Sequence, residues 1–205
     1  AVAGLFVKFL GAFFRIPLAN LIGAVGMANY APAYSLYNFL LVFSTTGLPV
    51  AVSKMVAERH AIGQYYEAER VFKLSRTIML VMGLAGCVFV FVFADAIANL
   101  VHVPGAALSM RATAPALVLV PLMASYRGYF QGMQEMSPTA ISQVVEQMFR
   151  VVIGLTLAIF LMSTPVFPDF SPQERGAAGG TFGASAGAFG GLLAVLLIYL
   201  LKRKN

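Results

Sequence analysis

Two basic side chains lie inside the first apolar stretch of the sequence. They belong to a stripe with spacings of four, three and four residues, which places its members on one face of an α-helix: Gly4, Lys8, Gly11 and Arg15. The glycines leave space beside the two cations, and Pro17 loosens the helix next to them by removing a backbone donor. Such a stripe suits an anionic group that enters a cavity. The alternative is that Lys8 extends to the membrane surface and Arg15 pairs with an acid elsewhere.

A second polar stripe with the same spacings lies near residues 138–162, and its members are Thr139, Gln143, Glu146 and Arg150. A charge near the centre of a bilayer costs about 2.5 to 3.5 kcal/mol, so these residues must face protein or a water-filled cavity. Glu146 and Arg150 stand one turn apart in the favourable acid-first order, and pairing would let both charges remain in the membrane. The pair is either purely structural or part of a polar wall whose arginine exchanges partners when substrate arrives.

Further polar residues sit in two other apolar stretches. Asn38 and Thr45 share a helix face with Tyr34, where they either contact sugar hydroxyls or hydrogen-bond to a neighbouring helix. Arg127 and Gln131 lie one turn apart near a helix end, where we expect them to bind lipid phosphate or to brace an inner loop.

The composition requires a membrane environment for these residues. Of the 205 residues 60% are hydrophobic and only 11% are charged, and the mean hydropathy is +0.83, whereas a soluble domain carries about 25% charged residues. The net charge of +6 lies beside apolar runs, so membrane topology and anionic lipid headgroups explain it better than a nucleic acid does. The single Cys87 excludes an intrachain disulfide and a cysteine cluster for a metal. We expect no cofactor.

The apolar runs predict an all-α bundle of six transmembrane helices in a single domain, over residues 1–22, 30–55, 77–100, 110–130, 138–162 and 181–201. Residues 64–76 are predicted to form an amphipathic helix at the membrane surface. We expect kinks at Pro115 and Pro121 and a bend near the sequence STTGLP. In the sixth helix, Gly183, Gly187 and Gly191 recur every four residues, with Gly179 just before them, and this spacing indicates a helix-packing face.

Loop charge predicts the orientation of the bundle. If the N-terminus is cytoplasmic, the inner segments hold nine basic residues and the outer loops hold two, Arg111 and Arg175. The inner ones are Lys54, Arg59, Arg70, Lys73, Arg76, Arg127, Lys202, Arg203 and Lys204. The positive-inside rule therefore puts both ends of this segment in the cytoplasm. No basic region precedes a cleavage site near Ala1, so we expect no removable signal peptide, and we expect the chain to be a piece of a longer protein.

Motifs of enzymes are missing from the sequence. His60 and His102 fall on opposite sides of the membrane in this topology, and we find no nucleophile elbow, P-loop or paired carboxylates. We therefore expect a protein that is not an enzyme.

Three stretches resemble the polysaccharide biosynthesis, or stage V sporulation protein B, family. They are FLGAFFRIPLANLIGAVGMANY, GLPVAVSKMVAERHAIGQYYEAERVF and APALVLVPLMASYRGYFQGMQEMSPTAISQVVEQMFRV, and they follow the order found in the family. The family belongs to the superfamily of MurJ-type lipid II flippases, oligosaccharide-lipid flippases and multidrug exporters. The resemblance covers most of the chain to about residue 160.

The resemblance implies a fold of two six-helix lobes around a central cavity, of which this chain is the N-terminal lobe. It also implies that undecaprenyl-diphosphate-linked sugars are moved across the bacterial cytoplasmic membrane by alternating access. Arg15 looks like the match for a diphosphate-binding arginine, and Lys8 occupies a place where another basic residue is often found. The sequence departs from the MurJ-type pattern at Leu41, where a further arginine is expected, and this favours the sporulation-protein branch.

Three functions follow as alternatives. The first is a lipid-linked oligosaccharide flippase, with membrane lipids and a C-terminal lobe of the same protein as its partners. The second is an ion-coupled exporter of organic cations; this would need an unpaired intramembrane carboxylate, yet basic groups outnumber acids within the predicted helices. The third is a non-transporting scaffold that recruits enzymes of the cell envelope.

Overall fold

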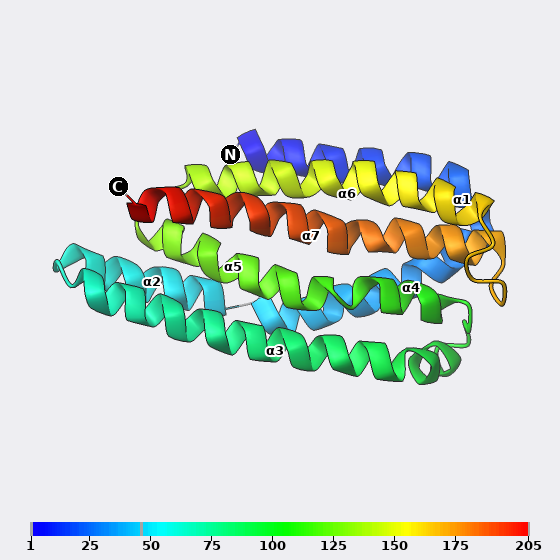
Figure 1. The fold of residues 1–205 in the computed structure, drawn as a ribbon, viewed down its shortest axis with the longest axis horizontal. Coiled ribbons are helices and arrows are strands. Elements are labelled where there is room, and N and C mark those ends of the chain that lie inside the picture. The colour runs from blue at the N-terminus through cyan, green and yellow to red at the C-terminus, as the bar shows by residue number, and fades with distance from the viewer. Residues whose placement is uncertain (1, 46, 205) are drawn as a thin grey trace.

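The computed structural model describes the backbone of residues 2–45 and 47–204, and the side chains of residues 9, 11, 13–42, 47 and 49–202. Within these ranges every regular element is an α-helix (Figure 1). The helices are α1 (Val2–Thr45), α2 (Leu48–Ala61), α3 (Tyr65–Leu100), α4 (Ala106–Thr113), α5 (Ala116–Gly132), α6 (Ser137–Ser163) and α7 (Pro172–Lys204). The predicted all-α class is confirmed.

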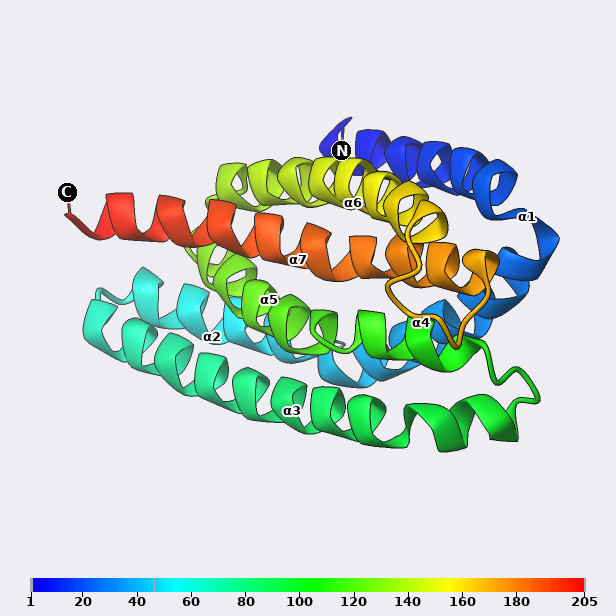
Figure 2. The same ribbon diagram turned by 45° about the vertical axis from the view of Figure 1, so that its right-hand side comes forward.

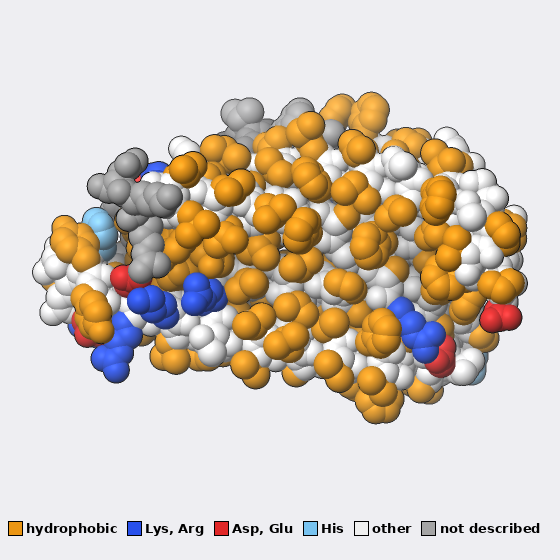
Figure 3. Space-filling view, in the orientation of Figure 1, with side chains coloured by type: hydrophobic (Ala, Val, Ile, Leu, Met, Phe, Trp, Pro, Cys, Tyr) orange, Lys and Arg blue, Asp and Glu red, His pale blue; other side chains and the backbone are white. Residues whose placement is uncertain are grey.

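Four stretches of the described residues are long and apolar enough to cross a membrane: α3, the combined α4 and α5, α6, and α7. The space-filling view shows apolar side chains over the middle of the molecule and charged side chains gathered toward its two ends (Figure 3). This distribution matches a bilayer core with water on either side. The chain is a multi-pass membrane protein.

Helix α1 is broken at Gly23, where φ is 68° and ψ is −172°. Residues with a Cβ atom rarely adopt this backbone conformation, whereas glycine adopts it without a steric penalty. The first half of α1 (residues 2–22) and the second half (residues 24–45) therefore run in opposite directions and move apart from the break, the first half beside α6 and the second toward α4 and α5 (Figures 1 and 2). The gap of residues 23–29 between the first two predicted helices is in fact this one residue, because the helix resumes directly after it.

The other helix limits differ from the prediction where a local feature decides them. The predicted helix 30–55 is divided: α1 ends at Thr45 and α2 begins at Leu48, directly after Gly47, whose φ is 89°. The predicted segments 64–76 and 77–100 are one continuous helix, α3, since neither glycine nor proline interrupts residues 65–82. The predicted kink at Pro115 is a break between α4 and α5, whereas α5 continues through Pro121.

Helix α7 begins at Pro172, nine residues before the predicted start at 181. The backbone N–H of Ser171 donates to Glu174 Oε2 (2.7 Å), and the N–H of Glu174 donates to Ser171 Oγ (3.3 Å). This reciprocal pair is a capping box, which satisfies two backbone donors at the start of a helix. The connection between the predicted helices 138–162 and 181–201 is therefore shorter than expected.

The glycine stripe of α7 packs directly against α6. A Cβ built at Gly187 would lie 2.7 Å from the carbonyl oxygen of Glu146, and one at Gly183 would lie 2.8 Å from that of Arg150. Gly179 and Gly191 meet Ala158 and Ser142 in the same way. Only glycine permits this backbone approach, so the predicted packing face is confirmed.

The two halves of α1 belong to different parts of the core. The first half packs on α6 and α7 through Phe14, Leu18 and Ile22, which contact Ala158 and Ala177. The second half packs on α3, α4 and α5, where its buried Ala33 and Tyr37 lie in one cluster of small apolar side chains. The helix hairpin thus spreads between two groups of helices, and a space remains between its halves.

Candidate functional site

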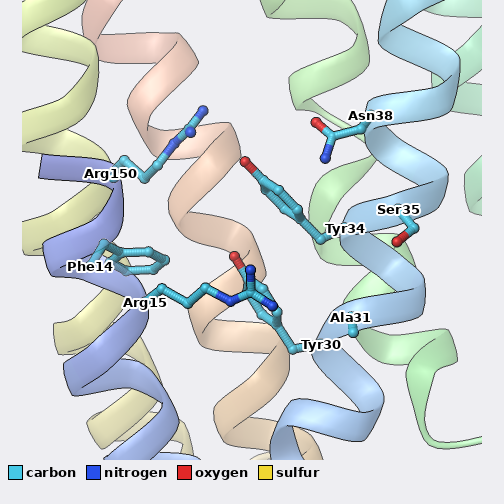
Figure 4. Close-up of a pocket in the computed structure, with 9 residues that line it drawn as sticks. Phe14, Arg15, Tyr30, Ala31, Tyr34, Ser35, Asn38 and Arg150 are labelled. Atoms are coloured by element: carbon cyan, nitrogen blue, oxygen red, sulfur yellow. The ribbon is translucent and has the colours of Figure 1, made fainter. Parts of the chain in front are cut away.

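A cavity of about 560 Å³ lies between the two halves of α1 and is bordered on one side by α6 (Figure 4). The first half contributes Gly11, Phe14 and Arg15, the second half contributes Tyr30, Ala31, Tyr34, Ser35 and Asn38, and α6 contributes Arg150. Arg15, Ser35 and Asn38 are exposed, so the cavity opens to the surface of the chain.

The cavity carries positive charge. Two of its lining residues are arginines, and none of the described lining residues is acidic. Arg15 and Arg150 start from different helices, and Figure 4 shows both side chains reaching toward the second half of α1. Two guanidinium groups facing one space are suited to an anion with several oxygens, such as a phosphate or a diphosphate.

The wall opposite the arginines is aromatic and polar. The rings of Tyr30 and Tyr34 stack with centroids 5.5 Å apart and an angle of 13°, and Tyr34 also contacts the ring of Tyr37 at 5.7 Å. Asn38 continues this wall one turn beyond Tyr34 (Figure 4). Aromatic faces beside hydroxyl and amide groups give the cavity both apolar surface and hydrogen-bonding partners.

Glu146 lies next to the cavity and contacts two arginines. Its Oε2 accepts a hydrogen bond from Arg127 Nη2 (2.9 Å), and its Oε1 lies 3.4 Å from Arg150 Nη2. Arg127 also donates from Nε to Ser142 Oγ (2.8 Å). The side chains of Arg127 and Arg150 are 15% exposed and that of Glu146 is 11% exposed, so all three are largely shielded by protein. With two cations and one anion, the cluster keeps one net positive charge.

The structure brings some of the predicted site residues together and places others elsewhere. The structure brings Arg15, Asn38 and Arg150 together at the cavity, although they come from three separate helical segments. Glu146 pairs with Arg150, as the acid-first spacing predicted, and Gln143 is half-buried on α6 outside the cavity lining. The side chains of Lys8 and Thr45 lie outside the described residues.

Arg127 and Gln131 contact α6. Besides the contacts of Arg127, Gln131 Nε2 lies 3.5 Å from Thr139 Oγ1, so the two residues join the end of α5 to the start of α6. The expectation that Arg127 binds lipid phosphate finds no support in these contacts, because its guanidinium is directed at Ser142 and Glu146. The contacts join α5 to α6 across residues 133–136, which agrees with the other expected role, the bracing of a loop.

Sequence reasoning did not assign Tyr30 and Ser35 to the site. A signal was present, since Tyr30, Tyr34 and Asn38 recur every four residues and share one helix face. Tyr30 was interpreted as the first residue of a helix, and its side chain was therefore not considered. The helix actually starts directly after Gly23, which gives Tyr30 a defined direction into the cavity.

Comparisons with known proteins agree on one family. The family model described as "Polysaccharide biosynthesis protein" matches residues 1–203. The chain is 35% identical over 207 residues to lipid II flippase MurJ of Bacillus subtilis, a match that covers 97% of this chain and 37% of that protein. No solved structure matches the chain.

Two other proteins of Bacillus subtilis are similar to a comparable degree. The chain is 30% identical over 202 residues to stage V sporulation protein B, with 98% of this chain and 38% of that protein covered. It is 31% identical over 201 residues to the uncharacterized membrane protein YabM, with 96% and 35% covered. The chain thus spans less than two fifths of the length of these relatives.

Proposed function

The chain belongs to the polysaccharide biosynthesis protein family, and on that premise we propose that it is the first lobe of a lipid flippase. The proposed substrate is an undecaprenyl-diphosphate-linked oligosaccharide, a precursor of peptidoglycan or of a related cell-envelope polymer. The flippase would move the sugar headgroup from the cytoplasmic to the outer leaflet of the bacterial cytoplasmic membrane. This is transport and involves no chemical conversion of the substrate.

One observation carries the proposal: Arg15 and Arg150 border the same open cavity, and no acidic side chain lines it among the described residues. A diphosphate needs cationic, hydrogen-bonding partners inside the membrane, where a lone charge is costly. Asn38, Ser35 and the tyrosine wall would contact sugar hydroxyls, and the polyprenyl tail would remain in lipid.

We propose that a second lobe closes the open side of the cavity. The side chains of Arg15, Ser35 and Asn38 are exposed in this chain, and in a two-lobed transporter they would face the central space. Rocking of the two lobes about a site near the midplane would then expose the headgroup on either side in turn.

The end of the bundle where α2 meets α3, which carries several basic residues, is proposed to be cytoplasmic. Lys54, Arg70 and Lys73 lie on α2 and α3 at that end, and the positive-inside rule orients it inward. A cysteine placed at Gly63 or at His102, with Cys87 changed to Ser, would test this in whole cells. A membrane-impermeant thiol reagent should label the cysteine at position 102 and spare the one at position 63.

The experiment on the function uses the intact protein reconstituted in vesicles with a fluorescent undecaprenyl-diphosphate-linked sugar. Arg15→Ala should lower the flipping rate at least about tenfold, because a charge-assisted contact to phosphate is lost. Arg59→Ala is the matched control, since Arg59 is exposed and bonds to Gln64 at the far end of α2. Flipping by Arg15→Ala at the wild-type rate would exclude the diphosphate role.

The main alternative is export of an organic cation. The acid nearest the cavity, Glu146, contacts two arginines, so it is a poor partner for a positively charged substrate. A transport assay with a lipophilic cation separates the two functions: uptake or efflux driven by the intact protein would favour the exporter.

A further inference from the structure

Arg127 and Arg150 compete for one carboxylate, and they do so unequally. Arg127 contacts Glu146 at 2.9 Å and is held in place by a second hydrogen bond, from its Nε to Ser142. Arg150 reaches Glu146 only at 3.4 Å, through one nitrogen. A hydrogen bond weakens as the distance grows toward 3.5 Å, so Arg127 is the principal partner of Glu146.

The remaining hydrogen-bonding capacity of Arg150 is largely unused. Its Nε is buried and has no hydrogen-bond partner among the described residues. A guanidinium group offers five N–H donors, and leaving a buried donor unsatisfied is unfavourable. Arg150 is also the member of the cluster that lines the cavity, whereas Arg127 and Glu146 do not. The cation with spare donors therefore lies where a ligand can reach it.

We propose that Arg127 is a positioning residue that neutralises Glu146, so that Arg150 is free to bind one phosphate of the diphosphate while Arg15 binds the other. This inference rests on the proposed function and adds to it a second phosphate ligand and the residue that keeps that ligand available. Without Arg127, the carboxylate of Glu146 would pair with Arg150 alone and compete with the substrate.

The close contact between α6 and the glycine stripe of α7 (Gly179, Gly183, Gly187 and Gly191), here called the glycine seam, keeps α6 in place. Glu146 and Arg150 stand one turn apart on this one helix, so their side chains stay close to each other wherever α6 lies. The charge of Glu146 cannot be separated from Arg150 by a shift of the helix. Among the side chains that the structure describes, Arg127 of α5 is the cation from another helix that contacts Glu146 and can neutralise it.

The test measures binding of undecaprenyl diphosphate and of inorganic pyrophosphate to the purified intact protein. Arg150→Gln should weaken binding of both probes at least about tenfold, and Arg127→Gln should weaken it by a similar factor although Arg127 touches neither probe. Arg127→Lys keeps the charge and should bind within about threefold of wild type. The decisive variant is the double change Arg127→Gln/Glu146→Gln, which should recover binding to within about threefold of wild type.

The double change Arg150→Gln/Glu146→Gln is the matched control, and it should remain weak because the phosphate ligand itself is missing. Thermal unfolding of every variant shows whether a loss of binding reflects a loss of fold. If Arg127→Gln does not fold, Glu146→Gln alone decides: it should bind at least as tightly as wild type.

The outcomes separate this inference from the proposed function. If Arg127→Gln/Glu146→Gln melts like wild type but binds as weakly as Arg127→Gln, or if Arg150→Gln binds normally, the inference is overturned and the function stands on Arg15. If wild type binds pyrophosphate with the expected order of variants but does not bind the lipid diphosphate, the proposed function is overturned and the phosphate site remains. Binding of neither probe to wild type overturns both.

Discussion

On the side of α6 that faces α7, backbone meets backbone, whereas on the side that faces α1, side chains border an open cavity. The glycines of α7 leave no room for a methyl group at the carbonyl oxygens of Glu146 and Arg150. Gly11, across the cavity on α1, has none of the described atoms within 4 Å of the place where a Cβ would stand. Glycine thus allows close helix contact between α6 and α7, and it leaves open space beside the cavity.

The difference between these regions shows how a charge can be held precisely inside a membrane. The glycine seam fixes the position of α6 along its axis and its rotation about that axis. Arg150, on the side of α6 that faces the cavity, is thereby held in a defined place. Packing of small residues is the main source of helix association in lipid, where burial of apolar surface gives little. The seam should therefore control stability, and the cavity should control binding.

The largest effect is expected from Gly187→Leu. A leucine side chain in the seam would have to displace the backbone of α6, and we expect the free energy of unfolding to fall by about 3 kcal/mol or more. Unfolding in detergent, followed by circular dichroism, measures the change. A variant as stable as wild type would show that the seam can open without cost.

A matched pair of alanine substitutions sharpens the comparison. Gly187→Ala should lower the free energy of unfolding by about 1 to 2 kcal/mol, because its Cβ would lie 2.7 Å from the Glu146 carbonyl oxygen. Gly11→Ala adds the same methyl group in open space and should raise stability by about 0.5 kcal/mol through helix propensity. Equal effects at the two positions would remove the distinction between seam and cavity.

On the cavity side, Asn38→Ala should change binding and leave stability nearly unaltered. Asn38 is exposed, and its amide would lose a neutral hydrogen bond to a sugar hydroxyl, which corresponds to about a three- to tenfold weaker affinity. The measurement compares the dissociation constant for a lipid-linked sugar with the midpoint of thermal unfolding. A large drop in that midpoint would mean that Asn38 supports the fold instead.

The smallest effect is expected from Arg111→Gln. Arg111 of α4 pairs with Asp95 of α3, and the carboxylate of Asp95 is 59% exposed at the end of the bundle. An exposed ion pair of this kind contributes about 0.2 to 1 kcal/mol and is screened by salt. Thermal unfolding at low and high salt should show a small difference at low salt that disappears at high salt.

Sequence patterns along one helix say which residues share a face of that helix, but they do not say how two helices pack. The glycine stripe was found because four-residue spacing on an apolar helix leads directly to close helix contact. Arg15 and Arg150 were each recognised, since a charge in an apolar stretch is costly wherever it stands. The two arginines border one cavity because of the way α1 and α6 pack. The spacing of residues within a single helix does not reveal how two helices pack.

Arg127 illustrates the same limit. It lies near a helix end, where a long cationic side chain can reach the membrane surface at little cost, so the sequence left two roles open, binding of lipid phosphate and bracing of an inner loop. Its actual partner, Glu146, is on the next helix, and only the packing of α5 against α6 brings them within 2.9 Å. The helix limits failed for a related reason: capping at Ser171 and the backbone angles at Gly23 and Gly47 are decided by single residues.

The break at Gly23 also bears on the order in which the protein is made. Because the chain reverses there, two walls of the cavity belong to one hairpin and leave the ribosome together, with Arg15 already opposite Tyr30. The third wall, α6, is synthesised much later. We therefore expect this hairpin to insert into the bilayer as a unit, with Arg15 hydrated, before α6 inserts and Arg150 completes the cavity.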